Sequence, residues 1–288
     1  MNIDASSENH NGCLPVIVNA GGFKGGHTKL DASKSSQFLT SLMLTAPYTK
    51  EGIDIEMVGD YKTQYIDITM SVMRAFGAEV EHNAYRTYYI PGGQKYDGRD
   101  YTIEPDASNA SYFFAAAAVT GGRARASGIN IDSAQGDIRF VDVLEKMGCT
   151  VTREADSIEV LGPDRLSGID VDIKEISDTS LTLAAIAPFA SGPVHIRNIE
   201  HTRWQETNRI GAMVTELGKL GVDVVEHQDG VSILPSEISQ AAIDTYKDHR
   251  IAMSFALIGL KQPGIRINDP GCVAKTFPAY FDVLESIR

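Results

Sequence analysis

The chain has little cysteine and fewer basic than acidic residues. Its three cysteines, at positions 13, 149 and 272, are scattered and form no CxxC pair. That pattern excludes a disulfide framework and a cysteine-based zinc site, and it predicts a reducing, cytoplasmic location. The 26 basic residues face 38 acidic ones, for a net charge of −12. We therefore expect no nucleic-acid partner, because such a partner selects a basic surface.

Long apolar runs and several common catalytic motifs are also missing. No stretch approaches the roughly 18 apolar residues that cross a bilayer, so no membrane partner is expected. The first residues are polar and lack a signal pattern, which predicts a flexible tail over residues 1–13. Without GxxxxGK[ST], GxGxxG, HExxH or GxSxG, the sequence supports no nucleotide site, metalloprotease or serine hydrolase.

The chain does contain an internal repeat. DASKSSQF at 31–38 returns as DASNASYF at 106–113, and weaker copies begin at Asp178 and Asp248. The four aspartates are spaced by 75, 72 and 70 residues. A period of this length predicts stacked copies of one supersecondary unit.

Each unit continues with the same succession of elements. The stretches 65–81, 136–152 and 208–226 carry apolar residues at helical spacing, then a glycine, then a strand pattern. Gly77, Gly148 and Gly221 are expected to end their helices, because the position after a helix favours a left-handed backbone. Further short strands are predicted within 93–104 and 156–164. The expected fold is α/β, with units that repeat strand, helix, strand, helix, strand.

The repeated aspartates lie where a strand meets the first helix of a unit. Their simplest role is to cap that helix, and we expect this of Asp31 and Asp106. Asp178 occupies the same position in the third unit, and capping a helix is its simplest role as well. If the units pack around a pseudo-threefold axis, several helix starts converge, and helix starts favour bound anions.

Four places offer more than a structural role. Ser35, Ser36 and Gln37 place two hydroxyls and an amide at a helix start, which suits a phosphate. Glu206 and Arg209 lie one helical turn apart, and their alternative is a surface ion pair. The other two are the start of the helix at 249 and the loop around Lys275.

His249 and Arg250 stand at a helix start, where a cation opposes the helix dipole, so this position suggests a bound anion. Lys275 lies in a loop bounded by proline and glycine, where the simplest alternative is a solvated side chain.

These pieces together resemble the 5-enolpyruvylshikimate-3-phosphate synthase family over residues 13–288. The motifs that carry the resemblance are GGFKGG (21–26), DASKSSQF, YIDIT (65–69), QGDIRF (135–140), QETNR (205–209), KDHR (247–250) and AKTFP (274–278). It implies the enolpyruvyl transferase fold, with six βαββαβ units in two domains. Four units are present, so the chain is expected to lack roughly 140 N-terminal residues. Residues 14–100 would be a single unit of one domain, and 101–288 the three units of the other.

The resemblance implies transfer of the enolpyruvyl group of phosphoenolpyruvate to the 5-hydroxyl of shikimate 3-phosphate, without metal or organic cofactor. It implies catalytic roles for Asp178 and Glu206. The residues implied for shikimate 3-phosphate are Ser35, Ser36, Gln37, Tyr65, Asp178 and Gln205, and those for phosphoenolpyruvate are Gln37, Arg209, Arg250 and Lys275. The expected partners are these small anionic substrates.

The sequence departs from the family pattern at several of these positions. Gln205 and Asn208 replace a lysine and an aspartate of the usual KETDR. Lys62, Thr63 and Gln64 stand where Ser-x-Pro is common, and His201 stands where many members have asparagine.

Three interpretations remain open from the sequence. The chain is a transferase, alone or completed by an N-terminal chain; or a relic that binds shikimate 3-phosphate without turnover; or a UDP-N-acetylglucosamine enolpyruvyl transferase, against which SSQF and KDHR argue. We expect little activity from the chain alone. Apolar surface at Phe38, Leu42 and Val72 is expected to promote self-association.

Overall fold

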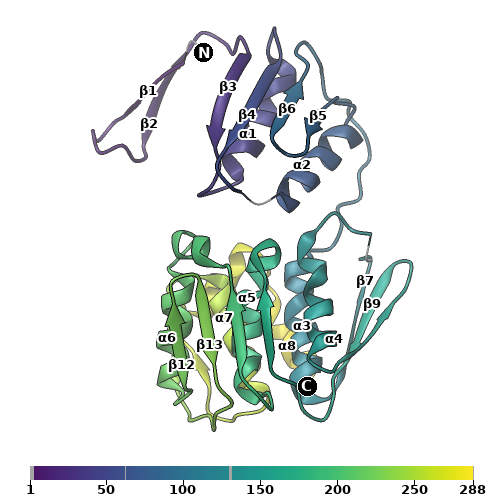
Figure 1. Ribbon diagram of the computed structural model, residues 1–288, viewed down its shortest axis with the longest axis vertical. Coiled ribbons are helices and arrows are strands. Elements are labelled where there is room, and N and C mark those ends of the chain that lie inside the picture. The colour runs from purple at the N-terminus through teal and green to yellow at the C-terminus, as the bar shows by residue number, and fades with distance from the viewer. Residues whose placement is uncertain (1–2, 62, 130–131, 288) are drawn as a thin grey trace. The chain divides into compact units, whose positions relative to one another are not determined.

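The computed structural model describes residues 3–61, 63–129 and 132–287 (Figure 1). The chain divides into two compact units, residues 1–102 and 103–288. Each unit has its own hydrophobic core and is described by itself. None of the helices in these described ranges combines the length and apolar character needed to cross a membrane.

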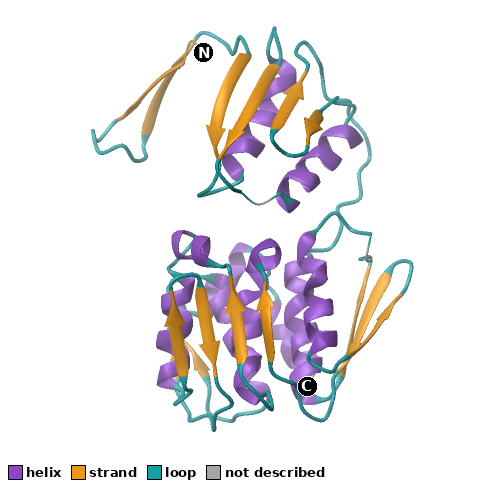
Figure 2. Cartoon of the chain, in the orientation of Figure 1, coloured by secondary structure: helices purple, strands orange, loops and turns teal. Residues whose placement is uncertain are grey.

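The first unit is a four-stranded sheet with two helices, preceded by a hairpin (Figure 2). Its elements are β1 (Ile3–Ser7), β2 (Val16–Ala20), β3 (Gly26–Asp31), α1 (Gln37–Thr45), η1 (Ala46–Tyr48), β4 (Ile53–Val58), α2 (Gln64–Ala75), β5 (Glu81–Asn83) and β6 (Thr87–Ile90). The strand order is β3-β4-β6-β5, and β3 is parallel to β4.

The N-terminal hairpin corrects the prediction of a flexible tail. Residues 3–7 form β1, which pairs antiparallel with β2 in a register that joins Asp4 to Asn19. Every residue of β2 is exposed, so the hairpin covers no core. Backbone hydrogen bonds between β1 and β2 hold it. A polar sequence permits such pairing but has no apolar alternation that would predict it.

The core of the first unit forms between the sheet and its helices. Alternate residues of β4 point inward, and they meet the buried faces of α1 and α2. These inward residues are Ile53, Ile55, Met57, Leu39, Met43, Ile66, Met70 and Met73. The expected exposure of Phe38 is confirmed, at 52%. Leu42 and Val72 are partly buried instead.

The second unit contains three helix-and-sheet repeats. Its elements are α3 (Ala107–Thr120), β7 (Arg123–Ser127), η2 (Gly136–Arg139), α4 (Phe140–Lys146), β8 (Thr150–Arg153), β9 (Ser157–Leu161), β10 (Ile169–Asp172), η3 (Lys174–Thr179), α5 (Ser180–Ile186), η4 (Ala187–Phe189), β11 (Val194–Arg197), η5 (Glu200–Trp204), α6 (Arg209–Lys219), β12 (Val224–His227), β13 (Gly230–Ile233), β14 (Ala242–Ile243), α7 (His249–Ala256), η6 (Leu257–Leu260), β15 (Arg266–Ile267), η7 (Pro270–Lys275) and α8 (Tyr280–Ser286).

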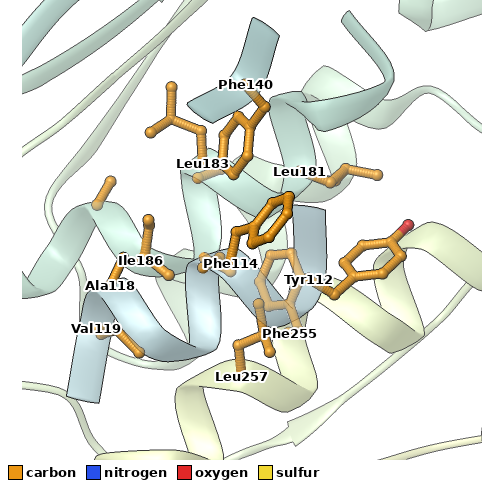
Figure 3. Packing of buried hydrophobic residues seen from close by; sticks show 14 of the residues in the cluster. Tyr112, Phe114, Ala118, Val119, Phe140, Leu181, Leu183, Ile186, Phe255 and Leu257 are labelled. Carbon is orange, nitrogen blue, oxygen red and sulfur yellow. The ribbon is translucent and has the colours of Figure 1, made fainter. Parts of the chain in front are cut away.

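Helices α3, α5 and α7, the first helices of the three repeats, meet in the interior of this unit. Side chains such as Phe114, Leu183 and Phe255 lie together there, one from each helix (Figure 3). A line of buried hydroxyls also crosses the three helices: Ser111 to Thr182 at 3.3 Å, and Thr182 to Ser254 at 3.4 Å. The repeat therefore brings equivalent helices side by side.

The strand order in the sheets confirms most of the predicted repeat and contradicts one predicted strand. The order β10-β11-β13-β12, with β10 parallel to β11, matches the order of the first unit. The last repeat keeps the parallel pair β14 and β15. The strand predicted within 156–164 is β9, whereas 93–104 contains no strand. Consequently β7 pairs only with β9 among the described strands.

Helix ends agree with the sequence at the glycines and only partly at the aspartates. Gly77, Gly148 and Gly221 all have positive φ, at 83°, 105° and 79°. Asp106 caps α3 by accepting from the backbone N–H groups of residues 108 and 109. The same prediction is wrong for Asp31, whose Oδ1 accepts from the N–H of residue 33. Helix α1 begins only at Gln37, six residues after Asp31.

We expect Asp106→Ala to lower the free energy of unfolding of the second unit by about 1 kcal/mol, because two N–H groups of α3 lose their acceptor. Asp106→Asn is the matched control, since asparagine caps a helix as well as aspartate does. Urea titration followed by circular dichroism measures both variants. Equal stability of the alanine and asparagine variants would contradict the capping role.

Candidate functional site

A cluster of charged side chains lies in the second unit, at the starts of α6 and α7 and the ends of η3 and η7. Five segments contribute to it: Asp178 from η3, Gln205 and Glu206 from the loop before α6, Arg209 from α6, Asp248 and Arg250 around the start of α7, and Lys275 from η7. The sequence predicted six of these seven residues as site residues. The structure brings all six together in direct contacts.

Arg209 is the centre of this cluster and is 1% exposed. Its Nε donates to Asp248 Oδ2 at 2.9 Å, and its NH2 group donates to Glu206 Oε2 at 2.8 Å and to Asp248 Oδ1 at 3.4 Å. Its NH1 group donates to Asp178 Oδ1 at 3.1 Å and to Gln205 Oε1 at 2.5 Å. All five N–H groups of the guanidinium are therefore engaged.

Electrostatics explains how a buried guanidinium keeps its charge. Burial lowers the pKa of Arg209, but the charges of Asp178 and Asp248 outweigh burial and raise it. Local structure fixes the geometry: Asn208 caps α6 by accepting from the N–H of Gly211 at 3.1 Å. The pair of Glu206 and Arg209 is thus a partly buried contact and not the surface pair that the sequence left open.

Asp178 joins this centre to α7. Its Oδ2 accepts from the NH2 group of Arg250 at 3.1 Å, while Oδ1 accepts from Arg209. Arg250 also donates to the hydroxyl of Tyr112 at 3.4 Å. Burial raises the pKa of Tyr112 to about 12. The capping alternative for Asp178 is not seen, because Thr179 holds the position before α5 and makes no side-chain cap.

Lys275 completes the cluster through Glu206. Its Nζ donates to Glu206 Oε1 at 2.5 Å, and about half of its side chain is exposed. Burial raises the pKa of Glu206, but the hydrogen bond from Lys275 and the charge of Arg209 outweigh burial, so the pKa lies below its usual value. Glu206 is therefore ionised at neutral pH in this state.

The charges of the cluster balance. The carboxylates of Asp178, Glu206 and Asp248 face the cations Arg209, Arg250 and Lys275. His249 adds no charge at neutral pH, because burial and the charge of Arg250 lower its pKa. Each cation of the cluster is therefore already paired with a carboxylate.

The other predicted residues lie in the first unit. Ser35 and Ser36 precede α1, and Gln37 is its first residue. Ser35 Oγ accepts from the backbone N–H of Gln37 at 3.2 Å. Tyr65 lies on α2, which contacts α1 through a hydrogen bond of 3.1 Å between the hydroxyls of residues 40 and 69.

The sequence departs from the family pattern at His201 and Lys62 among other positions, and the structure describes the first of these two. His201 Nε2 lies 2.9 Å from the hydroxyl of Ser177, which precedes Asp178. Lys62, noted for its departure from the family pattern, lies outside the described residues. Within the described ranges, no three His, Cys, Asp or Glu side chains form a group that could hold a metal ion.

The sequence analysis missed one residue of the cluster, Asp248, and one neighbour of the cluster, Tyr112, whose hydroxyl accepts from Arg250. Asp248 was taken only as a member of the repeat, although it is wholly buried and binds Arg209. Tyr112 was not considered, although the octet repeat aligns it with Gln37. Comparing the same position across all copies of the repeat was the signal that would have found both.

A groove elsewhere in the second unit contains none of these residues. Its volume is about 710 Å³, and α3, β7 and α8 line it. Its walls are mainly alanine and larger apolar side chains, with two arginines of β7. The charged cluster, and not this groove, is therefore the candidate site.

Comparison with known proteins places the chain beside one family. The family model described as EPSP synthase (3-phosphoshikimate 1-carboxyvinyltransferase) matches residues 1–284. A 3-phosphoshikimate 1-carboxyvinyltransferase from Nostoc sp. is 52% identical over 280 residues, which are 97% of this chain and 66% of that protein. The one from Marinomonas sp. is 43% identical and is covered to 68%. The chain thus spans about two thirds of the length of the curated relatives it matches.

Solved structures agree at the level of the fold. An EPSP synthase from Acinetobacter baumannii matches with a TM-score of 0.83 at 24% identity, over 99% of this chain and 68% of that one. The enolpyruvyl transferase NikO from Streptomyces tendae matches with a TM-score of 0.71 at 18% identity, over 94% of this chain and 66% of that one. The predicted enolpyruvyl transferase fold is therefore confirmed.

The pairing of Lys275 with Glu206 predicts a pKa change. Lys275→Met removes the hydrogen bond that offsets burial, so the pKa of Glu206 should rise. NMR titration of the carboxyl carbon measures it. The pairing stabilises the fold above the unfolded pKa of glutamate, and this contribution fades as pH falls through the lower folded pKa. Lys261→Met, an exposed lysine away from the cluster, is the control. An unchanged Glu206 midpoint would contradict the pairing.

Proposed function

The chain belongs to the EPSP synthase family, and we propose that it transfers the enolpyruvyl group of phosphoenolpyruvate to the 5-hydroxyl of shikimate 3-phosphate. The products are 5-enolpyruvylshikimate 3-phosphate and phosphate, on the route to chorismate and the aromatic amino acids. The observation that carries the proposal is the buried cluster in which Arg209 is bound by three carboxylates, beside two further cations. This arrangement provides both proton-transfer groups and anion-binding groups.

We propose that Arg250, Lys275 and Arg209 bind phosphoenolpyruvate by exchange of partners. A substrate phosphate or carboxylate replaces Glu206 on Lys275 and Asp178 on Arg250. Lys275 is the most accessible of the three, since about half of its side chain is exposed. Arg209 contacts a substrate oxygen only where that oxygen displaces one of its present acceptors. Arginine suits such a role because its planar N–H groups match the geometry of carboxylate and phosphate.

The two carboxylates Asp178 and Glu206 are proposed to move the protons of the reaction. The 5-hydroxyl loses its proton to Asp178 as its oxygen bonds to the central carbon of phosphoenolpyruvate, and the methylene carbon gains a proton from Glu206. The C–O bond to phosphate then breaks as a proton of the new methyl group returns to Glu206 and the double bond reforms, and the proton held by Asp178 leaves with the phosphate. When the substrate takes Lys275 away from Glu206, burial raises the pKa of Glu206, which favours its protonated form.

Six residues are proposed to contact shikimate 3-phosphate. In the first unit these are Ser35, Ser36, Gln37 and Tyr65, at the start of α1 and on α2. Gln37 is also assigned to phosphoenolpyruvate. In the second unit they are Asp178 and Gln205, which lie within 3.4 Å of each other. The support for the first group is a helix start that carries hydroxyl and amide donors.

The domain assignment and location are proposals as well. We assign residues 14–100 to one repeat of the first family domain and 101–288 to the three repeats of the second. The division of the structure into residues 1–102 and 103–288 supports this assignment. A cytoplasmic location is supported by the three free cysteines, which suit a reducing compartment.

A second candidate function is binding of these substrates without turnover. The observation that favours it is the balanced charge of the cluster, which leaves no excess of cations for two anionic substrates. Phosphate release separates the two candidates. The chain is mixed with phosphoenolpyruvate and shikimate 3-phosphate, and a second arm adds, as a separate polypeptide, the segment of the Nostoc relative that this chain does not match.

We expect phosphate release that requires both substrates, with proton NMR identifying the enolpyruvyl ether product. Saturable binding of both substrates without release in either arm would favour the binding function. Failure to bind either substrate in either arm would overturn both candidates.

Arg250→Ala and Lys275→Ala are each expected to weaken phosphoenolpyruvate binding roughly ten- to hundredfold, because a charge-assisted hydrogen bond contributes about 1.5–3 kcal/mol. Isothermal titration calorimetry measures the affinity. Arg197→Ala is the matched control, since Arg197 belongs to the same unit but pairs with Asp170 on the surface. Unchanged affinity in both site variants would remove the site assignment.

A further inference from the structure

The turn between β14 and α7 has an unfavourable backbone. Tyr246 and Lys247 both lie in the left-handed region, with φ of 53° and 60°. Residues with a Cβ adopt this conformation only where their surroundings hold them in it. Asp248 follows at once, so the strained turn leads directly into the charged cluster.

Glu216 of α6 holds this turn. Its side chain is completely buried, and both of its oxygens accept hydrogen bonds. Oε1 accepts from the hydroxyl of Tyr246 at 2.6 Å, and Oε2 accepts from the backbone N–H of Asp244 at 3.0 Å. Lys219 Nζ lies 2.9 Å from each oxygen and neutralises the carboxylate. The Glu216 carboxylate thus binds the two residues of the turn that flank Thr245.

Helix α6 contacts the segment 244–250 through three side chains. Glu216 binds the turn, Lys219 Nζ donates to Asp244 Oδ2 at 2.7 Å, and Arg209, seven residues before Glu216 on the same helix, binds Asp248. Seven residues correspond to about two helical turns, or roughly 10 Å along the axis. The N–H of Asp248 also donates to the carbonyl of Thr245 at 2.8 Å. A shift at Tyr246 is therefore passed on to Asp248 and to the start of α7.

The start of α7 is where the proposed phosphoenolpyruvate residue stands. Asp248 accepts from the N–H of Arg250 at 2.9 Å, and the guanidinium of Arg250 reaches Asp178. Neither Glu216 nor Tyr246 contacts these atoms directly. Their influence on Arg250 runs through the backbone of the turn.

We propose that Glu216 and Tyr246 form a positioning pair that fixes Asp248 and Arg250 in the geometry that binds the carboxylate or phosphate of phosphoenolpyruvate, a role that rests on the proposed function. Burial and the bond to Glu216 raise the pKa of Tyr246 to about 12, so its hydroxyl remains a donor across the neutral range. The alternative is that the pair stabilises the second unit without affecting the site.

Tyr246→Phe tests the pair, because it removes one hydroxyl and keeps the ring and the backbone. We expect phosphoenolpyruvate affinity to fall about tenfold, while affinity for shikimate 3-phosphate stays within about twofold. Tyr280→Phe is the matched control: its hydroxyl donates to the carbonyl of Met253 at 2.7 Å in the same unit, away from the turn. The control should lose similar stability with both affinities unchanged. Isothermal titration calorimetry measures the affinity of each of the two variants for each of the two substrates.

Hydrogen exchange gives a readout that needs no ligand. In Tyr246→Phe the amides of Asp244 and Asp248 should lose protection, whereas in Tyr280→Phe they should keep it. Glu216→Gln is a second variant, which retains an acceptor for Tyr246 but loses the charge facing Lys219. It should weaken phosphoenolpyruvate binding in the same direction.

The outcomes separate this inference from the proposed function. A wild-type chain that binds no phosphoenolpyruvate, either alone or with the added segment of the Nostoc relative, overturns the proposed function and the ligand part of this inference together. A wild-type chain that binds it, with Tyr246→Phe binding equally well, overturns the positioning role alone. Loss of affinity for phosphoenolpyruvate together with loss of protection at Asp244 and Asp248, in Tyr246→Phe but not in Tyr280→Phe, supports it.

Discussion

The second unit is organised around one buried guanidinium. Removing a cation from water costs several kcal/mol, and Arg209 offsets that cost only because three carboxylates and an amide accept all five of its N–H groups. These acceptors come from η3, from the loop before α6 and from the start of α7. The pair of Arg209 with Asp248 is wholly buried, and breaking a buried ion pair costs about 3–5 kcal/mol in other proteins. Arg209 therefore fixes the relative placement of segments up to 70 residues apart.

The balanced charge of the cluster has a chemical consequence. Each cation is already paired with a carboxylate. Under the proposed function, an anion that takes the place of Glu206 on Lys275 removes one of the two partners that lower the pKa of Glu206, while its burial persists. Binding an anion and preparing a proton donor would then be coupled through one ion pair, that of Lys275 with Glu206. The network that stabilises the unliganded protein would also supply the proposed groups for proton transfer.

Repetition explains how one supersecondary unit carries different chemistry at equivalent places. The octet repeat aligns Gln37, the first residue of α1, with Tyr112, the sixth residue of α3. It aligns Asp31, Asp106, Asp178 and Asp248, yet the four carboxylates do different things. Asp106 caps its helix, Asp31 bonds within its own turn, and Asp178 and Asp248 bind arginines. The backbone of the unit is kept, and the side chains at the helix starts have diverged into separate roles.

The sequence by itself determined the repeat, its helices and most of the site. Helical spacing with a terminal glycine located α2, α4 and α6, because these signals are local and depend on a few neighbouring residues. The family resemblance carried by its motifs implied six of the seven cluster residues. Tertiary structure decided the rest. The hairpin of β1 and β2, the missing strand before α3 and the true partners of Asp31 and Asp178 all depend on which distant backbone or side chain lies nearby. The same holds for Asp248 and Glu216, whose burial and partners arise only when α6 and the turn before α7 meet.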